Sequence, residues 1–121
     1  GAPVIVLSSS IASHAPVGGD LAQTTRVYRT KICHTTLERA IIDAAGIRFD
    51  APDLDWSAIG DAGEDVISQL VPIDPRATPG PAALDVVLTY RCNPLHFVWP
   101  IVVRRPPRHF EITRGLPNGQ S

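Results

Sequence analysis

The sequence of 121 residues has no methionine, a single lysine and two cysteines. Its net charge is -1, so no overall excess of positive charge favours nucleic acid or an anionic membrane as its partner. It has no apolar run of about 18 residues, the length that a helix needs to cross a bilayer. It also lacks a glycine-rich phosphate loop and a Gly-x-Ser-x-Gly elbow. The chain therefore lacks two common sequence signatures, one of nucleotide-binding proteins and one of hydrolases.

The composition suits a small folded protein. Apolar residues make up 44% of the chain, enough to fill a core, and the length suits one compact domain over residues 1–121. Four of the 12 prolines fall between residues 72 and 81, which predicts a stiff, extended internal connector. Residues 115–121 have the composition of a flexible tail.

Two segments carry signals typical of helices. Thr35 and Glu38 fit a capping box, and the apolar residues that follow recur at helical spacing up to Gly46, which predicts a helix over residues 36–45. A second capping box at residues 61–64 precedes an apolar stripe that ends at Pro72, which predicts a second helix. The members of the two stripes are Leu37, Ile41, Ile42 and Ala45, and Val66, Ile67, Leu70 and Val71.

Strand signals surround these segments. Residues 84–92 alternate between apolar and mixed positions, and residues 24–33, 97–103 and 108–114 show similar two-residue periods. In the last of these, Phe110 and Ile112 share one face, opposite His109 and Glu111. We therefore expect an α+β fold, with a mainly antiparallel sheet and two short helices on one side. The alternative is a β-sandwich with a helical insertion.

The two cysteines, Cys33 and Cys92, allow one internal disulfide. Two reduced thiols in the core are the alternative. A zinc site that also uses His34 and His96 is weaker, because adjacent strand residues such as Cys33 and His34 point to opposite faces. We expect no metal and no cofactor.

Charge is segregated along the chain. Residues 43–85 carry nine acidic and two basic residues, whereas residues 86–121 carry five arginines and one glutamate. Opposite poles favour docking to a charged partner or head-to-tail self-association. The candidate partner-binding residues are Asp50, Asp53 and Asp55 in the acidic part and Arg104, Arg105 and Arg108 in the basic part. The three aspartates could also offer oxygens to Ca²⁺, but they lack the glycine and distal glutamate of an EF-hand loop.

The apolar residues Val4, Ile5 and Val6 form a further candidate surface. They predict a strand close to the start of the sequence that pairs within its own sheet or adds to the exposed sheet edge of a partner.

The leading hypothesis is a non-enzymatic structural or protein-interaction module, such as a subunit or accessory domain of a secreted, envelope or viral assembly. Its partner would be another protein or a second copy of the chain, its location extracytoplasmic or virion-associated, and no segment would span a membrane. One alternative is a small enzyme that uses His109 or His34 with a nearby carboxylate such as Glu111. Another is a single-strand nucleic-acid binder through the turn at residues 104–108, with Trp99 and Phe110 as aromatic platforms.

Overall fold

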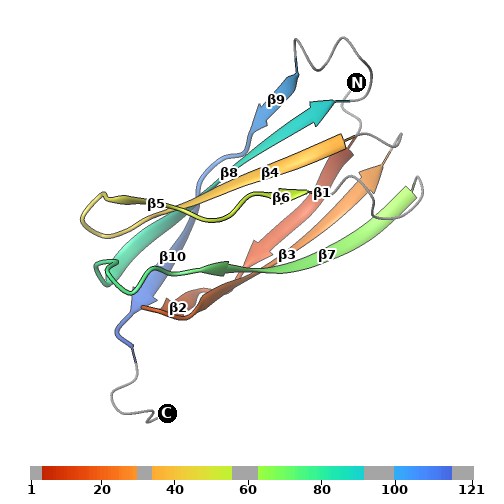
Figure 1. The fold of residues 1–121 in the computed structure, drawn as a ribbon. Helices are drawn as coiled ribbons and strands as arrows, with labels where there is room; N and C mark the ends of the chain where they lie inside the picture. Colours follow the sequence, from red (N-terminus) through yellow and green to blue (C-terminus); the bar gives the residue numbers. More distant parts are fainter. Residues whose placement is uncertain (1–3, 30–33, 56–62, 92–99, 116–121) are drawn as a thin grey trace.

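The computed structural model describes residues 4–29, 34–55, 63–91 and 100–115. Strands make up 71% of the described residues and none is helical. The strands form two facing layers (Figure 1). In chain order they are β1 (Val4–Ile11), β2 (His14–Pro16), β3 (Asp20–Arg29), β4 (His34–Ile42), β5 (Arg48–Asp50), β6 (Leu54–Asp55), β7 (Gly63–Pro72), β8 (Gly80–Arg91), β9 (Ile101–Arg104) and β10 (Arg108–Thr113).

The first layer is a three-stranded antiparallel sheet in the order β1-β3-β7. Side chains of β3 alternate: Leu21 and Val27 are fully buried, whereas Ala22 and Tyr28 are exposed. β1 pairs with β3 through a register shift between Val6 and Ser8, where a β-bulge interrupts the ladder. This sheet therefore buries one face and leaves the other in solvent.

The second layer is a seven-stranded sheet with the path β2-β10-β8-β4-β5, in which β6 also pairs with β4 and β9 with β8. β4 occupies one side of β8, so β9 and β10 share the other side. Residues 105–107, which include Pro106 and Pro107, separate these two short strands. Proline has no N–H to donate, so an interrupted outer strand is where a sheet tolerates it.

The core lies between the two sheets. Leu21, Val27 and Val71 come from the three-stranded sheet, and the opposite sheet contributes mainly β8 and β10 side chains, among them Leu84, Leu88, Tyr90, Phe110 and Ile112. The strand expected at residues 84–92 is present as β8 as far as Arg91, and the expected inward face of β10 is confirmed. Burial alternates only in the first half of β8, because Val87 and Thr89 are buried as well as Val86, Leu88 and Tyr90. The segment between β7 and β8 also contributes, since Ile73 and Ala77 are buried.

The expected α+β fold is wrong, and the first helix is a strand. Residues expected to be helical from 36 to 45 lie largely in β4, where Thr35, Leu37, Arg39 and Ile41 are buried at every second position. Leu37 and Ile41 are four residues apart, a spacing that suits one face of a helix and one face of a strand equally. β4 pairs with β8 over nine residues, and this long-range ladder overrides the local capping-box pattern.

The second expected helix is also a strand, β7. Ile67 and Val71 face the other sheet, whereas Val66 and Leu70 are 56% and 60% exposed on the outer face. The apolar stripe that indicated a helix is thus divided between the two faces of a strand. Two sheets are present, as the sandwich alternative expected, but no helical insertion occurs in the ranges described above.

A buried carboxylate organises the hairpin between β4 and β5. Asp43 is 4% exposed, and its two oxygens accept hydrogen bonds from the backbone N–H groups of Ala45, Ile47 and Thr78 at 2.8–3.0 Å. Burial by itself would raise the pKa of this carboxyl, but the hydrogen bonds from Thr78, Ile47 and Ala45 outweigh it and lower the pKa. Asp43 thereby joins the hairpin to the segment that leads into β8.

A buried arginine joins the two sheets on their β7 side. Arg39 extends from β4 and is 4% exposed; its guanidinium donates hydrogen bonds to the carbonyl of Leu70 in β7 at 3.0 Å and to that of Pro52 at 2.8 Å. Ala51, next to Pro52, is buried and its N–H donates to the carbonyl of Arg39. This side of the sandwich is therefore closed by a network centred on one side chain.

Candidate functional site

The seven-stranded sheet has an edge that carries acidic side chains. We call Asp50, Asp53 and Asp55 the acidic edge: Asp50 ends β5, Asp55 ends β6 and Asp53 lies between the two strands. All three are exposed. Arg48 lies within 2.9 Å of Asp50 and also contacts Asp85 at 3.4 Å, so it neutralises the charge in part.

The opposite side of the same sheet carries arginines. We call Arg104, Arg105 and Arg108 the basic edge: Arg104 ends β9, Arg108 begins β10 and Arg105 lies in the interruption between them. β2 covers β10 only at residues 111–113, so it does not reach this part of the edge. Within the described ranges none of the three arginines forms an ion pair with a carboxylate. The sequence-predicted acidic and basic residues thus lie at opposite edges of one sheet.

The arginines of the basic edge do not all point outwards. Arg105 is two residues from the inward-facing Val103, and Arg108 is two residues from the buried Phe110. Side chains two residues apart in extended backbone share a face, so Arg105 and Arg108 lie on the side that faces the other sheet. Arg105 is half-buried, whereas Arg104 and Arg108 are exposed. Arg105 is also close enough to the buried Tyr90 for its charge to offset part of the rise that burial causes in the pKa of that phenol.

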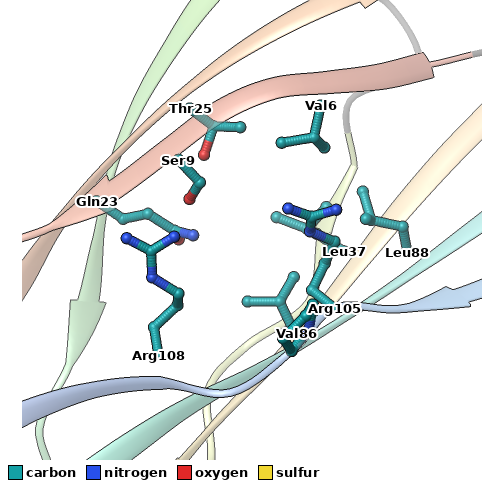
Figure 2. Close-up of a pocket in the computed structure, with 10 residues that line it drawn as sticks. Val6, Ser9, Gln23, Thr25, Leu37, Val86, Leu88, Arg105 and Arg108 are labelled. Atoms are coloured by element: carbon teal, nitrogen blue, oxygen red, sulfur yellow. The ribbon is translucent and has the colours of Figure 1, made fainter.

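Arg105 and Arg108 lie over a cavity between the sheets (Figure 2). The cavity has a volume of about 80 Å³ and is partly open to solvent. It lies on the β1 side of the sandwich, away from the Arg39 network. Its ten lining residues come from both sheets and from the interruption: Val6, Ser9, Gln23, Thr25, Leu37, Val86, Leu88, Arg105, Pro106 and Arg108.

The histidine interpretations receive uneven support from the geometry. The His34 Nε2 lies 3.4 Å from a carboxylate oxygen of Asp55, but both side chains are about half exposed and neither lines the cavity described above. His109 is exposed and Glu111 is half-buried, and among the interactions of the described residues there is none between these two side chains. Both histidines are exposed, whereas catalytic side chains are typically found in clefts.

The nucleic-acid interpretation loses one of its two aromatic platforms. Phe110 is 6% exposed and belongs to the core, so it cannot stack on a base. Trp99 lies outside the described residues. Arg105 and Arg108 line the cavity, and Arg104 and Arg108 are exposed.

In the part of the chain that the structure describes, no three His, Cys, Asp or Glu side chains are grouped closely enough to hold a metal ion. The three aspartates of the acidic edge, which the sequence offered as Ca²⁺ ligands, therefore do not converge. Zinc ligation by Cys33, Cys92 and His96 concerns positions outside the described residues.

Cys33 and Cys92 both lie outside the described residues, so their disulfide stays a prediction. The described β4–β8 ladder ends at the pair His34 and Arg91, and the two cysteines are the next residues of the sequence beyond that pair. We expect the unreduced protein, once denatured, to show no reactive thiol, and the reduced protein to show two. A count of two before reduction would exclude the bridge.

The predicted strand at Val4, Ile5 and Val6 exists and pairs within its own sheet, opposite Arg29, Tyr28 and Val27. β1 is an edge strand, and no strand among the described residues pairs with its other side. Val6 is half-buried and contributes to the cavity.

Sequence reasoning missed the polar residues inside the sandwich. Gln23, Arg39 and Asp43 are not among the sequence-predicted core or site residues, and Arg39 and Asp43 lie within the segment predicted as a helix. The two-residue alternation of Leu37, Arg39 and Ile41 is the signal that could have placed Arg39 among inward-facing residues. Gln23 similarly alternates with Leu21.

Among the described residues, no helix has the length and apolar character needed to cross a membrane. Comparison of the chain with protein-family models and with curated protein sequences finds no match.

Proposed function

We propose that this chain is a non-enzymatic structural module that associates head to tail with copies of itself, the acidic edge of one copy against the basic edge of the next. The observation that carries this proposal is the position of the two charged groups at opposite edges of a single sheet. Contacts between unlike surfaces join copies into rings or open chains, whereas a two-fold dimer needs a self-complementary surface.

A second copy suits these edges better than an unrelated charged partner, because each edge supplies the complement of the other. Three exposed aspartates would face three arginines that have no carboxylate partner in the described part of their own chain. Each such pair contributes only about 0–1 kcal/mol at an exposed surface, and salt screens it. The association is therefore weak, concentration-dependent and sensitive to ionic strength.

The polar surroundings of the histidines support a non-enzymatic role. The His34–Asp55 pair is about half exposed and does not line the cavity, whose ten lining residues include no histidine and no acidic residue. A general acid or base must lie within hydrogen-bond reach of the substrate proton that it transfers. The described side chains around the cavity fit recognition better than proton transfer.

Two charge-reversed variants test the proposal. Arg104→Glu/Arg108→Glu gives both edges the same negative sign, and Asp50→Lys/Asp53→Lys gives both edges a positive sign. We expect each variant to be monomeric by itself and an equimolar mixture of the two to associate, as measured by sedimentation velocity at low ionic strength. For the wild-type chain, a rise in salt from about 0.05 to 0.5 M should weaken association by about tenfold or more.

The matched control reverses two charges elsewhere. Arg26 and Glu64 pair on the outer face of the three-stranded sheet, so Arg26→Glu/Glu64→Lys exchanges their signs without a change in net charge. This variant should associate as the wild type does. A wild-type chain that stays monomeric at millimolar concentration and low salt, or a mixture of the two reversed variants that does not associate, would contradict the proposal.

A further inference from the structure

The cavity between the sheets combines three kinds of surface. Its apolar floor is formed by Val6 of β1, Leu37 of β4 and the β8 residues Val86 and Leu88. The wall from the three-stranded sheet is polar, with hydroxyl and amide groups, and the two inward-turned arginines lie on the rim (Figure 2). An apolar body next to fixed polar groups is the usual arrangement of a small-molecule site.

The polar wall contains a buried group that has no partner. Gln23 is 5% exposed, and its Oε1 atom is buried and accepts no hydrogen bond from the described residues. Figure 2 shows the Gln23 side chain directed into the same space as Arg108. A buried amide oxygen without a donor costs about 1–3 kcal/mol, so a molecule that donates to it would be bound favourably.

The neighbouring hydroxyls extend this wall. Ser9 and Thr25 are directly opposite each other in the β1–β3 ladder, and both line the cavity. Thr25 is 4% exposed. With Gln23, two residues away on the same face of β3, they form a continuous polar strip opposite the apolar floor.

The two arginines offer positive charge to an anion. Arg105 is half-buried and Arg108 is exposed, and neither forms an ion pair with a carboxylate within the described ranges. Arginine forks bind carboxylates through paired hydrogen bonds, and partial burial strengthens the attraction. An anion at the rim would therefore lie between Arg105 and Arg108, with the rest of the molecule below it.

We propose that this cavity binds a small apolar carboxylic acid that also carries a hydroxyl or N–H donor. The carboxylate lies between Arg105 and Arg108, the donor reaches the Oε1 atom of Gln23, and the aliphatic body packs on Leu37, Val86 and Leu88. The volume of about 80 Å³ is about half that of an engineered cavity that holds benzene, so it has room for a branched body of roughly three or four carbons.

This small-molecule site goes beyond the proposed self-association, although Arg105 and Arg108 belong to both. The acidic edge and Arg104 serve the association alone, whereas Gln23 and the apolar floor serve the site alone. Variants at Asp50 and Asp53 therefore test the association and variants at Gln23 test the site, so the two proposals can fail separately.

The probes for the test are 2-hydroxyisovalerate, isovalerate, isobutanol and inorganic phosphate. In an NMR titration of the ¹⁵N-labelled chain, we expect 2-hydroxyisovalerate to give saturable shifts at Gln23, Leu88 and Arg105 with a Kd of about 1 mM or lower. Isovalerate, which lacks the hydroxyl, should bind about threefold more weakly or worse, and isobutanol and phosphate at least about tenfold more weakly.

Three variants identify the groups responsible. Arg105→Gln should weaken binding of 2-hydroxyisovalerate by about tenfold or more. Gln23→Leu, which keeps the buried position filled, should remove the preference for the hydroxy acid over isovalerate. Arg104→Gln is the matched control, because Arg104 does not line the cavity, and it should leave both affinities unchanged. Amide spectra of all variants must retain the dispersion of the wild type.

Several results would overturn the proposal. They are the absence of saturable shifts with both acids at 20 times the expected Kd of about 1 mM, phosphate binding as tight as that of the hydroxy acid, or equal losses in the Arg104 and Arg105 variants. Phosphate binding of that strength would indicate a general attraction of anions to the basic edge. If Gln23→Leu retained the full preference for the hydroxy acid, the role given to the amide oxygen would be wrong.

Discussion

Replacement of Asp43 by alanine is expected to destabilise the fold by about 3 kcal/mol, and replacement by asparagine by about 2 kcal/mol. Alanine leaves the backbone N–H groups of Ala45, Ile47 and Thr78 without their acceptor. Asparagine has the same shape, but one of its carboxamide positions is an NH₂ group that cannot accept from a backbone N–H. Chemical denaturation at neutral pH measures both free energies of unfolding.

The pKa of Asp43 adds a dependence on pH. Because its folded-state pKa is lowered, the carboxylate stabilises the fold fully above the unfolded-state pKa of about 4. This contribution is lost as the pH falls through the lower folded-state pKa. The wild type should therefore lose stability more steeply than Asp43→Asn between about pH 5 and pH 2.

Asp20 provides the control for both experiments. It is exposed at the start of β3, so Asp20→Ala should change the free energy of unfolding by about 0.5 kcal/mol or less. Equal effects of Asp43→Ala and Asp20→Ala would show that the hydrogen bonds of the buried carboxylate do not stabilise the hairpin.

Replacement of Arg39 by methionine should destabilise the fold by about 2–4 kcal/mol. Methionine fills much of the same volume but offers no donor to the carbonyls of Leu70 and Pro52. Since one of these carbonyls belongs to β7, the loss should also be local: hydrogen exchange of β7 amides should accelerate more than that of β8 amides, which lie in the middle of their sheet.

Arg48→Met is the matched control for Arg39→Met. Arg48 also contacts two groups, Asp50 and Asp85, but its side chain is 48% exposed, and surface ion pairs contribute about 0–1 kcal/mol. A loss in the Arg39 variant no greater than that in the Arg48 variant would mean that the bonds between the sheets add little to stability.

The sequence correctly predicts those strands whose two-residue period does not also fit a helical spacing. β8 and β10 are of this kind, because apolar side chains at alternate positions have no competing helical interpretation. The sequences of β4 and β7 fit a helix as well as a strand. Ile67 and Val71 are four residues apart, as are Val66 and Leu70, so a helical stripe and two strand faces use the same positions.

Pairing with distant residues decides whether such a segment forms a helix or a strand. β4 lies against β8 some 50 residues later in the sequence, and β7 lies against β3. A short window of sequence contains neither partner. The many β-branched residues of β4, including Thr35, Thr36 and Ile41, favour a strand and were outweighed by the capping-box pattern.

The candidate site is likewise predictable only in part from the sequence. Segregated charge can be read directly from the sequence, and it located the acidic and basic residues that the fold places at opposite edges. The cavity could not be predicted, because Gln23 and Leu37 come from strands of different sheets and Arg105 comes from the interruption between β9 and β10. Which residues line a space between two sheets depends on how the sheets face each other.

The β-bulge in β1 has a consequence for how copies of this chain can grow into larger structures. An exposed edge strand is a template for further strands, and unrestrained addition there leads to amyloid-like fibrils. The register shift between Val6 and Ser8 breaks the even spacing of backbone groups along β1, so an incoming strand could match only one half of that edge at a time. The bulge thus protects this edge against continuous strand addition.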